Sequence, residues 1–232
     1  MKFAEAIRQK QAGGKIPVIP DIKCISPKHG DLLDGRCPVE MACLLKDAGA
    51  PVLSVVTQES NFGGSIKLLC QIVQKTGLPI LRKDFITNID DLKETLVSGA
   101  SAVLLMYETQ TEESLADLYH AALQMGLEVL VETHTAAQMQ MAARLGADMI
   151  GINNRDIKNL ERDDGTAANT CHLAALAPKD ALLISESGIE TPDDVDRVIA
   201  VGADAALVGT ALWQAVDMAV FYKQLCGGDY AD

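Results

Sequence analysis

Short apolar segments alternate with helical patterns along the whole of this 232-residue chain. The apolar segments are rich in Val, Ile and Leu, as expected of strands buried on both faces of a parallel sheet. Eight of them are predicted to be strands, at Val18–Lys23, Val52–Val56, Ile80–Lys83, Ala102–Met106, Val129–Glu132, Met149–Asn153, Leu182–Ser185 and Ala205–Val208. Helical patterns separate them, at Pro38–Ala48, Ser65–Thr76, Asn88–Ser98, Glu112–Met125, Ala136–Leu145, Gly165–Leu176, Pro192–Val201 and Trp213–Leu225.

The same helix ending recurs before several of these strands. Gly49, Gly99, Gly146 and Gly202 each stand between a helical pattern and the next strand. Glycine suits this place because many helices end in the left-handed conformation, which residues with a Cβ resist. Repeated strand-then-helix units favour a closed parallel barrel over an open doubly wound sheet. We therefore predict an α/β fold, a single (β/α)8 TIM barrel domain over residues 1–232 with a short N-terminal helix.

Charge and composition exclude several kinds of partner. The net charge of -12 argues against nucleic acid or an anionic membrane surface. No apolar run approaches the ~20 residues of a membrane span, and the first residues form a charged amphipathic stretch without the apolar core of a signal peptide. The six cysteines show no Cys-x-x-Cys spacing, which favours reduced thiols. These features predict a cytoplasmic protein.

Charged or polar residues stand at the carboxyl ends of several predicted strands. Lys83 and Glu132 each end an apolar run, Asp21 and Lys23 end the first strand, and Asn153 ends the sixth. An unpaired charge inside a protein costs several kcal/mol, so such positions are normally apolar. The active face of an α/β barrel lies at the carboxyl ends of its strands. These five residues are therefore the candidate catalytic residues.

Side-chain alternation places the candidate residues on one face of their strands. Residues two apart point the same way, which groups Asp21 with Ile19 and Lys23, Lys83 with Leu81, Glu132 with Leu130, and Asn153 with Gly151 and Arg155. Each group begins apolar or small and ends polar, toward the barrel mouth. Arg82 falls on the opposite face and is predicted to face a helix or the surface. The alternative is that the charges are interior salt bridges, but a mixed set of acid, base and amide at one rim favours a functional site.

Two glycine-containing turns follow the seventh and eighth predicted strands. One contains Ser187 and Gly188, and the other contains Gly209 and Thr210 and opens a short helix. Backbone N–H groups at a helix N-terminus bind phosphate well, and glycine lets the ligand approach closely. Barrels of this class commonly bind phosphate after strands seven and eight. A phosphorylated small-molecule substrate is therefore predicted.

Several segments, in order along nearly the whole chain, together resemble the indole-3-glycerol-phosphate synthase family of tryptophan biosynthesis. They are Asp21–Pro27, Leu53–Thr57, Phe62–Ser65, Pro79–Phe85, Glu132, Ile150–Asp156, Ile184–Ile189 and Leu207–Leu212. The resemblance implies a carbon-carbon lyase that closes the ring of 1-(2-carboxyphenylamino)-1-deoxyribulose 5-phosphate to give indole-3-glycerol phosphate, CO2 and water. It implies no metal and no cofactor, and it leaves other tryptophan-pathway enzymes open as partners.

The resemblance also implies a role for each site residue. Lys83 would be the general acid and Glu132 the general base, each contributing on the order of 10² to 10⁴ in rate. Lys23 would hold the substrate carboxylate or phosphate, and Asn153 and Arg155 would orient its polar groups. Pro27, Phe62, Phe85 and Leu104 would line the aryl pocket, and Ser187, Gly188, Gly209 and Thr210 would take the phosphate, with Glu186 beside it. Ser26 would be a further substrate-binding residue. Ordinary core packing is the alternative for the apolar ones.

Two features depart from the family pattern. The first strand ends Asp21-Ile22-Lys23 where the family has Glu-x-Lys, and the next loop reads Ser26-Pro27-Lys28-His29-Gly30 where Ser-Pro-Ser is usual. Aspartate is one methylene shorter, and a misplacement of about 1 Å can cost on the order of 10²-fold in rate. The family also usually has a longer extension before the first strand, and Phe3–Ile7 resembles the last of the helices that help to cover the site.

Two other functions remain open. A related barrel could act as an isomerase, epimerase or decarboxylase of pentose phosphates, but it would not need an aryl pocket, so Phe62 and Phe85 argue against it. A non-catalytic barrel could serve as a binding subunit. Such a protein would not need a paired acid and base, so Lys83 and Glu132 argue against that function.

Overall fold

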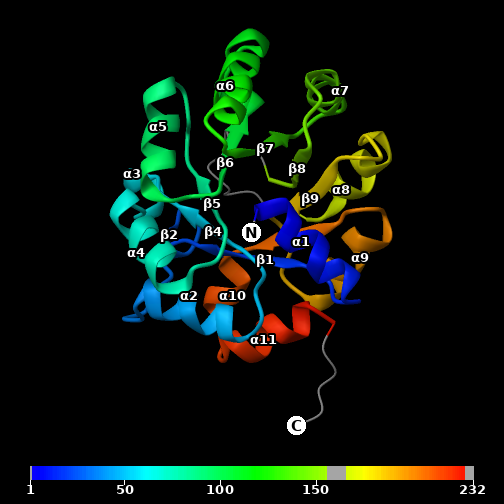
Figure 1. Ribbon diagram of the computed structural model, residues 1–232. Helices are drawn as coiled ribbons and strands as arrows, with labels where there is room; N and C mark the ends of the chain where they lie inside the picture. The colour runs from blue at the N-terminus through cyan, green and yellow to red at the C-terminus, as the bar shows by residue number, and fades with distance from the viewer. Residues whose placement is uncertain (1, 156–165, 228–232) are drawn as a thin grey trace.

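The computed structural model describes residues 2–155 and 166–227, and its centre is a closed barrel of parallel strands inside a ring of helices (Figure 1). The strands are β1 (Val18–Ile22), β4 (Leu53–Val56), β5 (Ile80–Lys83), β6 (Ala102–Met106), β7 (Glu128–Thr133), β8 (Met149–Asn153), β9 (Leu182–Glu186) and β10 (Ala205–Val208). They pair in chain order, and β1 closes the barrel by pairing with both β4 and β10. The predicted TIM barrel is confirmed, and every strand boundary lies within one residue of its prediction.

The helices follow the predicted pattern with one error. They are α1 (Phe3–Ala12), α2 (Pro38–Asp47), α4 (Ile66–Thr76), α5 (Ile89–Ser98), α6 (Glu112–Gln124), α7 (Ala136–Leu145), α8 (Ala168–Leu173, continued by the 3-10 turn η3, Ala174–Leu176) and α9 (Pro192–Ala200). Gly165, where the helix Gly165–Leu176 was predicted to begin, lies outside the described residues. The predicted continuous helix Trp213–Leu225 is wrong, because the chain forms α10 (Thr210–Gln214) and α11 (Met218–Leu225) instead. Ala215 is extended, and the Asp217 side chain accepts a hydrogen bond from Val220 N and so starts a new helix.

The predicted glycine helix ends are confirmed. Gly99 and Gly146 cap α5 and α7 with φ of 84° and 71°. Gly49 and Gly202 follow α2 and α9 with φ of 101° and 107°. A side chain with a Cβ would be strained in these conformations. Each glycine therefore turns the chain from a helix into the next strand of the barrel.

Several short elements that the sequence patterns did not predict follow the carboxyl ends of the strands. A hairpin of β2 (Ile25–Ser26) and β3 (Gly30–Asp31) follows β1, and the single-turn helix α3 (Glu59–Phe62) follows β4. The 3-10 turn η1 (Tyr107–Thr109) follows β6. None is long enough to show a periodic pattern in the sequence. These elements enlarge the rim on which a site can be built.

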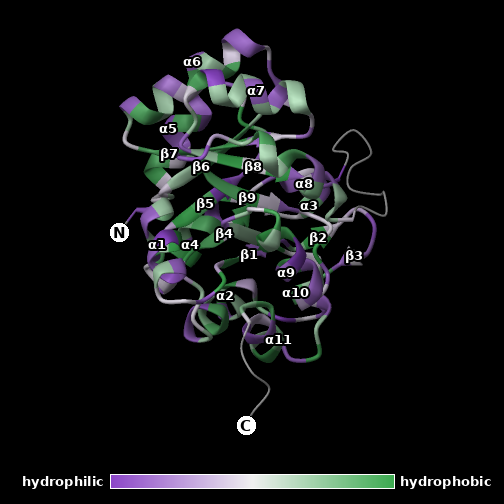
Figure 2. Cartoon of the chain, turned by 90° about the vertical axis from the view of Figure 1, so that its right-hand side faces the viewer, coloured by the Kyte–Doolittle hydropathy of each residue, from purple (hydrophilic) through white to green (hydrophobic). Residues whose placement is uncertain are grey.

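The interior of the barrel is a layered apolar core that α1 closes at one end. Its buried strand residues include Ile19, Leu81, Leu104, Leu130, Ile184 and Leu207. Phe3 and Ile7 of α1 are fully buried in the same cluster, and the Glu128 carboxylate accepts hydrogen bonds from Phe3 N and Ala4 N at the helix start. Because Glu128 begins β7, α1 lies at the amino ends of the strands. Figure 2 shows α1 and the β2–β3 hairpin at opposite ends of the barrel. The segment Phe3–Ile7 therefore seals the end of the barrel opposite the mouth and does not cover it.

Arg82 lies on the outer face of β5, as alternation predicts, and there it packs against α5. It donates hydrogen bonds to Thr95 Oγ1 and Asp91 O, and it forms an ion pair with Glu94 at 2.8 Å. Of the two predicted surroundings, the structure shows the helix-facing one, because Arg82 is only 4% exposed. This anchor fixes the end of β5, where Lys83 is the next residue.

Across the described ranges 2–155 and 166–227, no helix is both long enough and apolar enough to span a membrane.

Candidate active site

The five predicted catalytic residues all lie at the carboxyl end of the barrel. Asp21 is in β1 and Lys23 follows it, while Lys83, Glu132 and Asn153 lie at or next to the ends of β5, β7 and β8. Four of them are at most 5% exposed, and Lys83 is half-buried. Charged side chains this deeply buried at one rim are typical of an active site rather than of a solvated surface.

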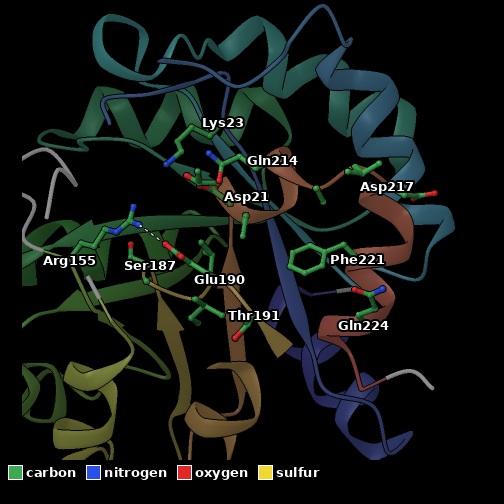
Figure 3. Close-up of a pocket in the computed structure, with 18 of the residues that line it drawn as sticks. Asp21, Lys23, Arg155, Ser187, Glu190, Thr191, Gln214, Asp217, Phe221 and Gln224 are labelled. Carbon is green, nitrogen blue, oxygen red and sulfur yellow. Dashed lines mark ion pairs between the residues drawn. The ribbon is translucent and has the colours of Figure 1, made fainter. Parts of the chain in front are cut away.

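Two adjoining cavities open at this rim and share Asp21, Lys23 and Lys83 in their walls. The larger has a volume of about 570 Å³ and is lined on the β9–β10 side by Arg155, Ser187, Gly188, Gly209 and Thr210 (Figure 3). The smaller, of about 40 Å³, is lined by Phe62, Phe85, Leu104, Met106 and Asn153. The two lysines thus stand between a polar compartment and an apolar one.

The turn after β9 has an unusual backbone. Ser187 and Gly188 both have φ of 65°, and a non-glycine residue with positive φ is uncommon. Across the cavity, Gly209 follows β10 and Thr210 begins α10. A Cβ on Gly209 would lie 3.3 Å from Asp21 Cβ and Oδ2, so glycine allows this turn to approach β1 closely. The structure therefore brings the four predicted phosphate-binding residues together around one cavity.

Asp21 is held from two sides. Its Oδ1 accepts a hydrogen bond of 2.7 Å from Ser54 Oγ on β4, and its backbone carbonyl accepts one of 3.0 Å from Trp213 Nε1 on α10. With Gly209 packed against it, the side chain has a fitted place in the wall of both cavities. The positions of Ser54 and Gly209 therefore fit an aspartate side chain at position 21.

We expect Asp21→Glu to lower kcat/KM by about 10-fold, because the extra methylene would carry the carboxylate away from Ser54 or press it against Gly209. Steady-state rates of the purified variants measure the effect. Asp180→Glu, the same change at an exposed position, is the matched control. A rise in kcat/KM would contradict this account and would mean that the short side chain is a handicap.

Glu132 and Glu186 place two fully buried carboxylates in the barrel mouth. Within the described residues, neither carboxylate oxygen of Glu132 has a hydrogen-bond partner. Such a group is costly to bury, so packing alone does not account for it. Glu186 follows Ile184 on the inward face of β9 and lies over Gly151, where any added Cβ would run into its carboxylate. The resemblance grouped Glu186 with the phosphate residues, but the structure directs its side chain into the barrel interior.

Lys23 and the hairpin beyond it form the rim on the β1 side. The Lys23 ammonium lies 5.7 Å from the centroid of the Phe62 ring, a cation–π distance. Ser26 is buried in β2 and Pro27 is half-buried beside it. Neither of them is among the described residues that line the two cavities. The structure thus places them near the mouth but outside the cavity walls.

The cysteines and the acidic residues do not form a metal site in the part of the chain that is described. All six cysteines lie in that part and are free thiols. Cys24, directly after Lys23, is buried, and burial raises the pKa of its thiol, with a smaller contribution from the negative charge of Asp31. Since the thiolate is the reactive form, Cys24 is a poor nucleophile.

Sequence reasoning missed a polar network behind the turn after β9. The Asn154 amide donates to the carbonyls of Glu186 and Ser187, each at 3.0 Å, and its oxygen accepts from Thr170 N at 2.9 Å. The hydroxyls of Thr170 and Ser185 lie 2.7 Å apart beside it. Asn154 therefore ties the turn to α8 and holds Ser187 in its left-handed conformation. A polar residue on the helix-facing side of a barrel strand was the signal that could have revealed it.

We expect Asn154→Asp to raise KM by about 10-fold and to change kcat by less than about 3-fold, because a carboxylate facing two carbonyls would release the turn that lines the polar cavity. The inhibition constant for inorganic phosphate should rise in parallel. Asn88→Asp is the control, since aspartate caps the start of α5 as well as asparagine does. A loss confined to kcat would contradict this role.

A closed (β/α)8 barrel with lysines, buried carboxylates and glycine turns at its mouth defines the class of α/β-barrel enzymes. A family model described as indole-3-glycerol phosphate synthase matches residues 1–225. The indole-3-glycerol phosphate synthase of Pyrococcus furiosus is 42% identical over 222 residues, which cover 96% of this chain and 95% of that protein. The enzyme of the same name from Thermococcus kodakarensis is 42% identical, with 96% of each chain covered. The chain belongs to the indole-3-glycerol phosphate synthase family, which comprises decarboxylating carbon-carbon lyases of tryptophan biosynthesis.

Two further comparisons show how far the likeness extends. The indole-3-glycerol phosphate synthase of Haloarcula marismortui is 40% identical over 209 residues, covering 90% of this chain and 75% of that protein. The solved structure of the N-acetylmannosamine-6-phosphate 2-epimerase from Clostridium perfringens is similar with a TM-score of 0.60, over 84% of this chain and 86% of the other. At 18% identity, this second likeness concerns the fold alone.

Proposed function

We propose that the protein converts 1-(2-carboxyphenylamino)-1-deoxyribulose 5-phosphate into indole-3-glycerol phosphate, CO2 and water. The observation that carries this proposal is that Lys23 and Lys83 line both the apolar and the polar cavity. A substrate with an aryl carboxylate at one end and a phosphate at the other would span the two cavities. Its ketone, the atom group that reacts, would then lie beside the lysines.

The proposed chemistry assigns one proton transfer to each side of the substrate. Lys83 donates a proton to the ketone oxygen as the aryl carbon attacks, and loss of CO2 restores the aromatic ring. In the last step Glu132 takes a proton from carbon, while the hydroxyl formed from the ketone oxygen takes up a second proton from solvent and leaves as water. General acid and general base catalysis each contribute about 10² to 10⁴ in rate. Glu132 is fully buried, and within the described residues its carboxylate oxygens accept no hydrogen bond, which supports its role as the base.

The proposed binding roles follow the two cavities. Lys23 holds the substrate carboxylate, while Asn153 and Arg155 orient the polar groups between the cavities. Phe62, Phe85 and Leu104 contact the aryl ring from the apolar side. The phosphate is held by Ser187, Gly188, Gly209 and Thr210, while Glu186 and Asp21 hold polar groups at the mouth and Ser26 and Pro27 cover it from the hairpin.

The direct test is the appearance of indole fluorescence when the purified protein receives the carboxyphenylamino deoxyribulose phosphate without added metal. We expect fluorescence to grow until the substrate is consumed. Pentose phosphates are the comparison, because an isomerase or epimerase would convert them and a synthase would not. A folded protein that gives no fluorescence would overturn the proposed function. Cytoplasmic location, a single functional domain over residues 1–232 and association with other tryptophan-pathway enzymes stay predictions.

A further inference from the structure

His134 is a partly buried ionisable residue beside the proposed base, and the mechanism above does not use it. It directly follows β7, two positions after Glu132, so both side chains point to the same face. His134 Nε2 lies 3.7 Å from Glu132 Oε1, and the two side chains are 12% and 0% exposed. In the described part of the chain, neither ring nitrogen has a hydrogen-bond partner. Buried polar atoms without a hydrogen-bond partner are rare in native proteins, so a pair of them side by side calls for an explanation.

The backbone of His134 is fixed from both neighbouring elements. Its N–H donates a hydrogen bond of 2.6 Å to Gln138 Oε1 in the first turn of α7. Its carbonyl accepts one of 3.1 Å from Asn169 Nδ2 on α8, and the same amide donates to the carbonyl of Asn153 at 2.9 Å. His134 is therefore held in place relative to two residues of the mouth, Glu132 and Asn153.

Other charged groups surround this pair on the neighbouring elements. Glu108 of η1 accepts a hydrogen bond of 3.0 Å from Gln138 Nε2, on the far side of that amide from His134. Lys83 ends β5, Arg155 follows β8 and Glu186 ends β9. Among the described residues, Glu132 is the acidic group that lies within 4 Å of the His134 ring. The imidazole therefore stands directly beside the buried carboxylate.

We propose that His134 is a positioning residue for the general base, holding the Glu132 carboxylate oriented at the barrel mouth. This inference rests on the proposed function for its catalytic consequence, but the pairing itself can be measured without substrate. A carboxylate with no side chain beside it could rotate away from the substrate. The imidazole, whose backbone is fixed through Gln138 and Asn169, limits that rotation.

Kinetics test the catalytic part. We expect His134→Ala to lower kcat about 10- to 100-fold with KM changed less than about 3-fold. His134→Asn, which keeps an N–H donor, should recover part of the rate, whereas His172→Asn, at an exposed position of α8, should act as the wild type. In a Glu132→Gln background, His134→Ala should change the rate less than about 2-fold. An equal loss in both backgrounds would overturn the proposal.

The histidine ring signals in NMR spectra test the pairing itself. The chain has four histidines, so each signal can be assigned by single substitution. The His134 ring signals should move in Glu132→Gln, because the substitution alters the group that lies 3.7 Å from its Nε2. The His172 ring signals should stay in place. Unmoved His134 ring signals would refute the pairing, even if the protein had no synthase activity.

Discussion

Lys83→Ala is expected to lower kcat by about 10³-fold while KM changes by less than about 3-fold. Lys83 stands in the walls of both cavities, at the place where the ketone of the proposed substrate would lie. An interaction made in the transition state and not in the ground state affects kcat, because only such interactions lower the barrier to reaction. Steady-state kinetics of the purified variant, followed by indole fluorescence, measure the two constants.

Two controls make the Lys83 result specific. Lys83→Arg keeps the charge but cannot donate its proton at neutral pH, so it should be nearly as inactive as the alanine variant. Lys93→Ala removes an exposed lysine of α5 that pairs with Asp90, and it should keep full activity. If Lys83→Ala raised KM and left kcat intact, Lys83 would be a binding residue and not the acid.

Glu132→Gln should have the second large effect, a fall in kcat of about 10² to 10³-fold. Glutamine has nearly the same shape as glutamate but cannot accept a proton, so the barrel mouth keeps its packing. The variant should also be more stable, by about 1 kcal/mol, because a neutral group replaces a fully buried carboxylate that accepts no hydrogen bond in the described chain. Urea unfolding followed by circular dichroism measures the change in stability.

The matched control for this substitution is Glu113→Gln, on the exposed side of α6, which should alter neither activity nor stability. Opposite signs for activity and stability at position 132 would mark a residue kept for function at the expense of the fold. Unchanged kcat in Glu132→Gln would remove Glu132 from the mechanism.

The sequence predicts the barrel well because each strand signal is local. An apolar run of Val, Ile and Leu ended by a charge, with a glycine after the preceding helix, is visible without knowledge of any distant contact. The same alternation places Lys83 and Glu132 on the inward face and Arg82 on the outward face of their strands, as the structure confirms for Arg82.

The structural features that the sequence does not reveal depend on contacts between residues far apart in the chain. The apolar face of α1 shows that Phe3 and Ile7 are buried, but only the contact with Glu128 shows that they close the amino end of the barrel. Asn154 and His134 are both visible as polar residues near strand ends. Their roles depend on Thr170 and on the approach to Glu132, which periodicity does not encode. The break between α10 and α11 was missed because the apolar pattern continues across it.

The measurement that tests the central claim most directly uses substrate labelled in its aryl carboxylate. Labelled CO2 and indole-3-glycerol phosphate are quantified together in the same reaction, with wild-type protein and no added metal. We predict that the wild-type protein releases one labelled CO2 for each molecule of indole-3-glycerol phosphate. The Lys83→Ala variant should form both products only at its residual rate, about 10³-fold lower. Release of CO2 without ring closure, or a rearranged substrate that keeps its labelled carboxylate, would contradict the claim that this barrel mouth carries out a decarboxylating ring closure.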